Sequence, residues 1–376
     1  MKLTDICDFQ GGSQPPKDEW SFDEQDGYVR MLQIRDFTQS ERVTPEYIKI
    51  SNSTKMCEAD DILIARYGAS IGKILTGLSG AYNVAIMRTI PDTSKIKKKY
   101  LYYYLKSSYF QNAIINVGSR AAQAGFNKED LSKLDIECPE LAEQDGIVNI
   151  LEKVEAIIEK RKEELSSLDD LIKARFVEMF GDMYLNTMAW RELHLETMAD
   201  IVSGITKGRK IAGKQLTKVP YMAVSNVKDG YIDWTTVKTI EATDQEINQY
   251  RLLSDDVLMT EGGDPDKLGR GAIIRAPLEN CIHQNHIFRV RLDESQILPD
   301  YFAEYLKHQR AKRYFLGCAK QTTGIASINM KQLKALPVLL PPLELQNEFS
   351  AFIRQVDKSK VVEIIVKNVS LLLHSD

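Results

Sequence analysis

The feature that most constrains the fold is one uninterrupted helical pattern over residues 141–181. This stretch has no proline, and Gly146 is its only glycine before Gly181. Apolar side chains recur at helical spacing in an otherwise charged segment, which predicts a single amphipathic helix. At a rise of about 1.5 Å per residue, the helix would be roughly 50–60 Å long. A globular core helix is far shorter on average, at about 11–12 residues. The apolar stripe therefore requires a partner helix.

Residues 343–376 show a second long helical pattern and supply the obvious partner. A heptad frame that places Ile147 at position a puts the apolar stripe of the first helix at positions a, d and e. The predicted interface residues of the first helix are Ile150, Val154, Ile157, Ile158, Leu165 and Leu168. Those of the second helix are Phe352, Ile353, Val356 and Val362.

The chain also repeats itself. Residues 3–12 resemble residues 195–204, and each copy predicts a short helical turn that ends at glycine. An apolar strand is predicted next, over residues 31–37 in the first copy and over residues 221–227 in the second. Matching helices and diverged strands indicate two related globules.

The repeat continues through an acidic pair followed by an apolar strand, at residues 60–65 and 255–260. A Pro-x-Leu-x-x-Gln element then opens the long helix of each copy, at residues 139–144 and 341–346. We therefore predict an α+β protein in which two similar mixed α/β globules are separated by a long antiparallel two-helix coiled coil, with a pseudo-two-fold internal repeat. The predicted segments are a first globule at 1–140, the first long helix at 141–181, a linker at 182–194, a second globule at 195–342 and the second long helix at 343–376.

Composition excludes several protein classes. Hydrophobic residues make up 43% of the chain and charged residues 27%, as in an ordinary globular protein. No apolar run reaches the roughly 20 residues that a membrane span needs, and the N-terminus lacks the apolar core of a signal peptide. The five cysteines are scattered and odd in number, so neither a disulfide framework nor a zinc ribbon is indicated. We expect a reducing, cytoplasmic setting.

The formal net charge of −4 argues against a nucleic-acid binder only until its distribution is considered. Residues 141–180 hold ten acidic and six basic side chains, and ten minus six accounts for the whole excess. The rest of the chain is neutral on balance, which leaves room for local basic faces.

No catalytic or metal-binding signature survives inspection. Residues 68–73 resemble a phosphate loop, but one residue is missing from the spacing and Ile74 replaces the hydroxyl residue that would hold magnesium. Cys281, His283 and His286 lack a fourth ligand at suitable spacing, so a strand with alternating faces explains them better than a metal site. Because no catalytic residue and no metal ligand is indicated, a binding module becomes the favoured class.

Glycine-containing loops carry the candidates for DNA contact in both globules. Arg, Lys, Gln and Thr on such loops suit both phosphate positioning and contact with base edges. Charged surface loops are also common in proteins that bind no nucleic acid, so each residue keeps that simpler interpretation. The candidates are Arg66, Tyr67, Lys73, Arg120 and Gln123 in the first globule, and Lys207, Arg209, Lys210, Lys267, Arg270, Lys320 and Gln321 in the second.

Two diverged globules, each followed by a long helix, resemble the specificity subunit of a type I restriction–modification system. The resemblance covers nearly the whole chain and is most specific at residues 60–63 with 255–258, and at 131–144 with 333–346. It implies that the globules are target recognition domains that read the two halves of an asymmetric bipartite DNA site. It also implies that the paired helices set the spacer and dock methyltransferase subunits. One departure is that the second long helix is shorter than the first.

The same resemblance implies the partners and cofactors. The expected partners are double-stranded DNA, two methyltransferase subunits and restriction/translocase subunits. S-adenosylmethionine, ATP and Mg²⁺ are expected on those subunits, with no cofactor on this chain, which is non-catalytic alone. Two alternatives stay open: an adaptor whose two heads bind proteins, and a repeated enzyme whose site carries no recognised motif.

Overall fold

The computed structural model describes residues 1–376 apart from 40–42, 119–124, 210–214, 264–267, 323–324 and 373–376, and describes only the backbone at 118, 321–322, 325 and 361–372. The chain divides into two compact units. The first unit comprises Met1–Arg161 with Ile365–Asp376, and the second comprises Lys162–Ile364. No helix in the described part of the chain is both long enough and apolar enough to cross a membrane.

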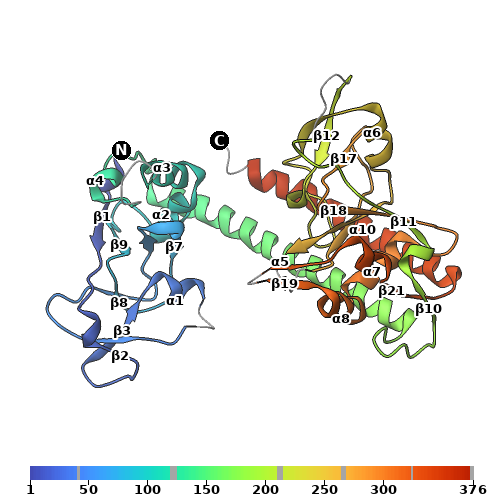
Figure 1. The fold of residues 1–376 in the computed structure, drawn as a ribbon. Coiled ribbons are helices and arrows are strands. Elements are labelled where there is room, and N and C mark those ends of the chain that lie inside the picture. The colour runs from blue at the N-terminus through green and yellow to red at the C-terminus, as the bar shows by residue number, and fades with distance from the viewer. Residues whose placement is uncertain (40–42, 119–124, 210–214, 264–267, 323–324, 373–376) are drawn as a thin grey trace. The chain divides into compact units, whose positions relative to one another are not determined.

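Both predicted long helices are present (Figure 1). Helix α5 spans Leu141–Phe180, and helix α10 spans Leu343–Leu372. Helix α5 ends at Gly181, which adopts a φ of 76° that other residues rarely tolerate. Its N–H donates to the carbonyl of Val177 at 2.8 Å, which satisfies one acceptor of the last turn.

Each unit contains a four-stranded antiparallel sheet with the same strand order. In the first unit the order is β1 (Cys7–Gly11), β9 (Ile86–Pro91), β6 (Leu63–Ala65) and β7 (Ile74–Leu75). In the second unit it is β11 (Ala199–Ser203), β18 (Ile287–Leu292), β14 (Val257–Thr260) and β16 (Gly271–Ile273). The register also matches, because Leu63 lies opposite Arg88 and Leu258 lies opposite Arg289. Both units are therefore mixed α/β and built on one plan.

A second sheet with one parallel strand pair accompanies the first sheet in each unit. Strand β3 (Tyr28–Leu32) runs parallel to β8 (Gly80–Tyr82), and β12 (Thr217–Met222) runs parallel to β17 (Ile282–His283). Around these pairs lie antiparallel strands β2 (Trp20–Ser21), β4 (Tyr47–Lys49) and β5 (Met56–Cys57) in the first unit, and β13 (Lys238–Ala242) in the second.

The strands predicted over residues 31–37 and 221–227 are too long. The chain turns into helix α1 (Ile34–Thr38) in the first unit and into the 3-10 turn η6 (Val224–Asn226) in the second. The side chain of Asp36 accepts the N–H of Gln33 at 2.9 Å, and that of Asn226 accepts the N–H of Ala223 at 3.0 Å. These local caps stabilise a helical turn against extension of the strand.

The turns predicted over residues 3–12 and 195–204 are also shorter than expected. Each copy has a 3-10 turn, η1 (Leu3–Asp5) or η5 (Leu195–Thr197), and the following residues form β1 or β11. The remaining elements are η2 (Lys17–Glu19), η4 (Gly68–Ser70), α2 (Lys98–Lys106), α3 (Ser108–Gly118), α4 (Lys128–Leu131), β10 (Arg191–His194), α6 (Asp244–Tyr250), β15 (Gly262–Gly263), α7 (Pro299–Lys307), α8 (Gln309–Cys318), β19 (Lys320–Thr322), β20 (Ile325–Ser327), α9 (Met330–Lys334) and β21 (Pro337–Leu340).

A buried glutamine joins the long helix of the first unit to its globule. Gln144 is fully buried at the start of α5. Its Oε1 accepts the backbone N–H of Lys97 at 2.8 Å, just before α2. Its Nε2 donates to the carbonyls of Lys95 and Pro139, both at 2.8 Å. One side chain therefore satisfies three backbone groups that no secondary structure pairs.

The second unit repeats this arrangement with Gln346, which is also fully buried. Its Oε1 accepts the N–H of Leu298 at 2.8 Å, and its Nε2 donates to Pro341 at 2.8 Å and to Gln296 at 3.2 Å. The Pro-x-Leu-x-x-Gln element therefore anchors each helix. Lys97 and Leu298 hold equivalent positions in the two units.

Two tyrosines per unit complete this anchor by donating hydroxyl hydrogen bonds to the segment that leads into the long helix. The pairs are Tyr100 to Glu137 O (3.0 Å), Tyr104 to Asp135 O (2.9 Å), Tyr301 to Leu339 O (2.6 Å) and Tyr305 to Pro337 O (2.7 Å). The equivalent acceptors show that the repeat extends to side-chain hydrogen bonds.

The interface predicted for α5 needs a correction at its d positions. Ile150, Ile157 and Leu171 are 64%, 56% and 48% exposed. In the first unit α5 packs against its own globule, where Gln144 and Val148 are buried. That packing centres the covered stripe on position e, with a and b beside it, and turns the d positions outward.

Of the other predicted interface residues, Val154, Ile158, Leu165 and Leu168 are half-buried. The second unit holds the best-covered part of the helix pair. Phe176 and Phe180 of α5 meet Phe349 of α10 edge to face, with ring centroids 5.3 and 5.5 Å apart. Val356 is buried beside them, and Phe352 and Ile353 pack against the same core. The side chain of Val362 lies outside the described residues.

We expect Gln144→Ala and Gln346→Ala each to lower the free energy of unfolding by about 1–3 kcal/mol, because buried backbone groups lose their partners. Glutamate at the same position keeps the acceptor but loses the donor, so Gln346→Glu should also destabilise the protein. Asn149→Ala, on the exposed side of α5, is the matched control and should change stability by less than about 0.5 kcal/mol. Urea unfolding measures all four variants. Equal midpoints for Gln144→Ala and Asn149→Ala would contradict the anchoring role.

Candidate nucleic-acid interface

In the first unit, the structure brings two of the predicted loops together. Tyr67 follows strand β6 and forms an isolated antiparallel bridge with Gly125. The guanidinium of Arg66 lies 5.0 Å from the centroid of the Tyr67 ring. Its Nε donates to the carbonyl of Phe126 at 3.3 Å, and its Nη1 donates to the carbonyl of Val84 at 3.4 Å. We call residues 66–67, 84 and 125–126 the first reading surface.

This surface combines a cation with exposed apolar atoms. Tyr67 and Val84 are 38% and 45% exposed. Lys73 lies beyond the glycine turn, is exposed and makes no ion pair among the described residues. Arg120 and Gln123 were predicted to contribute to this surface and lie outside the described residues. A guanidinium, an ammonium and an aromatic ring at one edge suit contact with phosphates and bases.

The second unit builds the equivalent edge from three short strands. Strand β15 carries Gly262 and Gly263, which pair with β20, and β20 pairs with β19. Lys320 at the start of β19 is exposed. Only the backbone of Gln321 is described, opposite Ala326. We call residues 261–263, 320–322 and 325–327, together with His286, the second reading surface.

An exposed hydrogen-bonded pair that the sequence did not single out lies on the second reading surface. His286 Nδ1 and Glu261 Oε2 are 2.5 Å apart. The side chain of His286 is 56% exposed, and that of Glu261 is 35% exposed. Glu261 aligns with Arg66 in the repeat. The reversal of charge between these aligned residues is the sequence signal that could have identified the pair.

Two candidates of the second globule lie elsewhere, beside the sheet formed by β12 and β13. Lys207 is exposed, with its Nζ 5.0 Å from the centroid of the Tyr221 ring. Arg209 binds Glu246 through Nε at 2.5 Å and through Nη2 at 3.0 Å, and also donates to the carbonyl of Glu241 at 2.8 Å. The hydrogen bonds from Arg209 lower the pKa of Glu246 to about 2. Its donors are therefore engaged within the protein, and we correct its role to a structural one.

The other candidates of the second globule contribute little to a described surface. Lys210 and Lys267 lie outside the described residues. Arg270 is half-buried beside β16, and its Nε is buried without a hydrogen-bond partner in the described part of the chain. Its backbone carbonyl accepts the N–H of Thr260 at 3.3 Å.

The acidic pairs at residues 60–61 and 255–256 are structural. Asp61 and Asp256 are buried, and each accepts a backbone N–H three residues upstream. Asp61 also pairs with Arg88 at 2.8 Å, and Asp256 pairs with Arg291 at 2.7 Å. Each carboxylate thus has both a cation and a backbone donor, so its burial is compensated. The pattern reflects how the sheet is stabilised rather than a catalytic centre.

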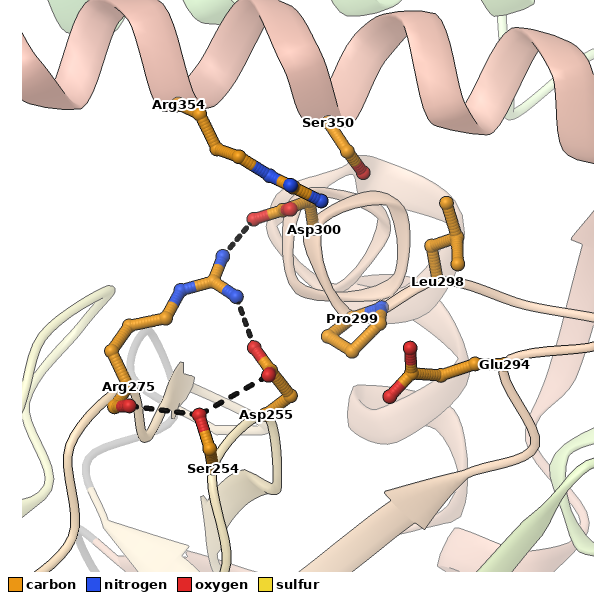
Figure 2. Close-up of a pocket in the computed structure, with 9 residues that line it drawn as sticks. All are labelled: Ser254, Asp255, Arg275, Glu294, Leu298, Pro299, Asp300, Ser350 and Arg354. Carbon is orange, nitrogen blue, oxygen red and sulfur yellow. Dashed lines mark hydrogen bonds and ion pairs between the residues drawn. The ribbon is translucent and has the colours of Figure 1, made fainter.

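Beside the second acidic pair lies a cavity of about 320 Å³. Figure 2 shows Arg275 reaching between Asp255 and Asp300 and hydrogen-bonding both carboxylates. In the first unit Lys98 serves this purpose and binds Asp60 at 2.7 Å. Pro299 occupies the equivalent position of the second unit and has no cation, and Arg275 from the loop after β16 supplies the charge. Its contact with Asp300 anchors α7.

Cys281, His283 and His286 lie in different environments. His283 is fully buried, and its ring nitrogens lie 3.0 Å from the carbonyl of Tyr250 and 3.3 Å from that of Val202. Burial lowers the pKa of His283 to about 4, whereas His286 faces solvent. Among the described residues there is no group of three or more His, Cys, Asp or Glu side chains that could hold a metal ion. The predicted strand with alternating faces is wrong, because Cys281, Ile282 and His283 are all buried, β17 ends at His283 and His286 lies in the turn before β18.

Comparison with known proteins matches this architecture. The chain is 22% identical over 272 residues to the type I restriction enzyme EcoKI specificity subunit of Escherichia coli K12, an alignment that covers 68% of this chain and 58% of that protein. It is 22% identical over 357 residues to the StySPI specificity subunit of Salmonella potsdam, covering 88% of this chain and 76% of that one. The chain therefore spans only part of the length of either relative.

Two solved structures share the fold. One is from a structure that describes complex assembly and conformational transition of the type I R-M system. It aligns with a TM-score of 0.51 at 16% identity, covering 100% of this chain and 94% of that chain. The type I restriction-modification S subunit from M. genitalium aligns with a TM-score of 0.51 at 15% identity, covering 99% and 92%. The family model of the type I restriction modification DNA specificity domain matches residues 1–167 and again residues 189–366. With two such matches spanning most of its length, the chain belongs to the type I restriction modification DNA specificity domain family.

Proposed function

We propose that this chain is the DNA sequence-specificity subunit of a type I restriction–modification complex. The observation that carries the proposal is the repetition of one globule plan, with the same sheet order and the same glutamine anchor. Each copy ends in a long helix. Two similar but non-identical heads suit a DNA site with two different halves. The first and second reading surfaces each serve one half-site.

In this proposal α5 and α10 form an antiparallel coiled coil that fixes the spacing of the heads and docks two methyltransferase subunits. The packing of Phe176 and Phe180 on Phe349 supports it. So does the ion pair between Asp169 and Lys360 at 2.6 Å, because residues before Phe176 meet residues after Phe349 only if the helices run antiparallel. The two copies would then be related by an approximate two-fold axis. The proposal keeps the domain boundaries predicted from the sequence.

In this proposal, other subunits carry out the catalytic steps. The chain itself is non-catalytic and carries no cofactor. Methyltransferase subunits supply S-adenosylmethionine chemistry on adenine, and restriction/translocase subunits supply ATP and Mg²⁺ chemistry. The chain contributes recognition of double-stranded DNA in the cytoplasm. The adaptor alternative has no specific structural feature in its favour.

Exchanging residues 195–340 for the equivalent domain of a relative should change one half of the recognised site and leave the other half unchanged. The physical reason is that each head reads DNA with its own loops. Mapping of methylated adenines in cells that carry the complete set of subunits measures the outcome. A simultaneous change in both halves would rule out independent heads.

Substitutions should distinguish side chains that contact bases from side chains that contact phosphates. We expect Arg66→Ala and Lys320→Ala each to weaken DNA binding by about 1–3 kcal/mol if the side chain reads a base, with relaxed specificity at one position. Lys73→Ala should weaken all sequences alike and reduce the slope of log affinity against log salt by about 0.9, the value for one phosphate contact. Titration of cognate and random duplexes at several salt concentrations distinguishes the two behaviours.

Two further variants act as controls for these contacts. Lys49→Ala, on the other sheet of the first unit, should leave binding unchanged. Arg209→Ala should reduce stability by breaking the bond to Glu246, with no change at any single base position. Full affinity in Arg66→Ala, Lys73→Ala and Lys320→Ala together would show that the reading surfaces are misplaced.

The helices can be tested as a ruler by inserting one heptad into both α5 and α10 beside the Asp169–Lys360 ion pair. Seven residues lengthen each helix by about 10 Å at roughly 1.5 Å per residue. Base pairs rise by about 3.4 Å, so the unread spacer should grow by about three base pairs while both half-sites keep their sequence. Insertion into α5 alone should destabilise the protein, because the two apolar stripes fall out of register. If methylation mapping shows the original spacer length, the helices do not set the distance between the two half-sites.

A further inference from the structure

One position is equivalent in the two units by its backbone hydrogen bond. The N–H of Arg66 donates to the carbonyl of Ala85 at 2.8 Å, and the N–H of Glu261 donates to the carbonyl of His286 at 3.0 Å. Both residues come immediately after a matching strand, β6 or β14. Residues 66 and 85 of the first unit therefore correspond to residues 261 and 286 of the second.

The two units present opposite hydrogen-bonding chemistry at this shared position. Arg66 has only donors, and its Nη2 makes no hydrogen bond in the described part of the chain, whereas Nε and Nη1 bind the carbonyls of Phe126 and Val84. In the second unit, a carboxylate can only accept, so the hydrogen between Glu261 and His286 is on Nδ1 of the imidazole. A neutral imidazole that donates from Nδ1 carries a lone pair on Nε2. No hydrogen bond to Nε2 is present among the described residues, so the pair offers acceptors to an incoming molecule.

This pair lies on the second reading surface. The N–H of Ile328, just after β20, donates to the carbonyl of Glu261 at 2.9 Å. The next residue, Gly262, pairs with Ser327, which in turn pairs with Lys320. A molecule held by the exposed Lys320 edge would therefore meet the histidine and glutamate side by side.

The charge of the pair decides which part of DNA it can meet. A carboxylate is repelled by phosphates, whereas the amino groups of adenine and cytosine project into the major groove as donors. Guanine presents acceptors there, which suit arginine. Acceptors in the second unit and donors in the first therefore fit different bases.

Building on the proposed function, we propose that Glu261 and His286 together read an adenine or cytosine amino group in the second half-site, whereas Arg66 reads guanine at the equivalent place in the first half-site. His286 makes the contact, and Glu261 acts as a positioning residue that holds its tautomer. One conserved backbone position thereby supplies two different base preferences.

The test uses the full chain assembled with its partner subunits and a library of duplexes in which both half-sites are randomised. His286→Ala should relax discrimination at a single position of the second half-site by about 5- to 150-fold, the range of one good base contact. Glu261→Gln should also relax discrimination at this position, because the amide can donate as well as accept and no longer fixes the tautomer. The effect should be smaller than that of His286→Ala, because the His286 side chain is still present. The first half-site should be unchanged in both variants.

Exchanging the pair sharpens the test. Glu261→Arg combined with His286→Ala installs the residues of the first unit and should switch that position from adenine or cytosine to guanine. Arg66→Glu combined with Ala85→His should produce the reverse change in the first half-site, which keeps the inference testable if one double variant fails to fold. Glu279→Gln, an exposed carboxylate elsewhere in the second unit, is the matched control and should change nothing.

The outcomes separate this inference from the function on which it rests. A wild-type complex without any bipartite preference would refute the proposed function. A wild-type bipartite preference, together with folded His286→Ala and double variants that keep every base preference, would overturn the assignment of Glu261 and His286 alone.

Discussion

The hydrogen bonds of one buried glutamine per unit hold the rest of the structure together. Gln144 and Gln346 each bind the backbone in front of a short helix and the backbone in front of a long one. The glutamine side chains are fully buried and the backbone groups they satisfy are partly buried, so leaving these groups unpaired would cost more than an ordinary exposed hydrogen bond contributes. This anchor fixes the direction in which each long helix leaves its globule. Any function that depends on the placement of the heads therefore depends on it.

Buried and exposed groups have diverged differently between the two units. Inside, the glutamine, the tyrosine hydroxyls and the buried aspartates Asp61 and Asp256 keep the same partners or the same kind of partner. At the surface, charges change freely: Lys98 gives way to Pro299 with Arg275, and Arg66 gives way to Glu261 with His286. Burial explains the contrast, because an unpaired group is costly only where water cannot replace the lost partner. A repeat of this kind can alter what each head recognises without altering how it folds.

The candidate interface was predictable only in part. Arg66, Tyr67 and Lys320 lie on described surfaces because glycine loops at strand ends are exposed by local geometry. Arg209 looked equivalent in the sequence, yet Glu246 and the carbonyl of Glu241 engage its donors. Those partners come from α6 and β13, and nothing near Arg209 in the sequence announces them. A charged residue on a loop is therefore a better predictor of solvent exposure than of hydrogen-bond donors that are free to contact DNA.

The sequence by itself determined the elements that local physics controls. These are the internal repeat, the two long helices and the end of the first long helix at Gly181. The turns after Leu32 and Met222 are also local, because side chains three residues away cap them. Tertiary structure alone decided which side of α5 is covered. Ile150 and Ile157 fit a heptad but face outward, because the globule next to the helix, and not only a partner helix, competes for its apolar stripe. The sequence pattern shows that α5 has an apolar face to bury, whereas only the tertiary structure shows which part of the protein covers that face.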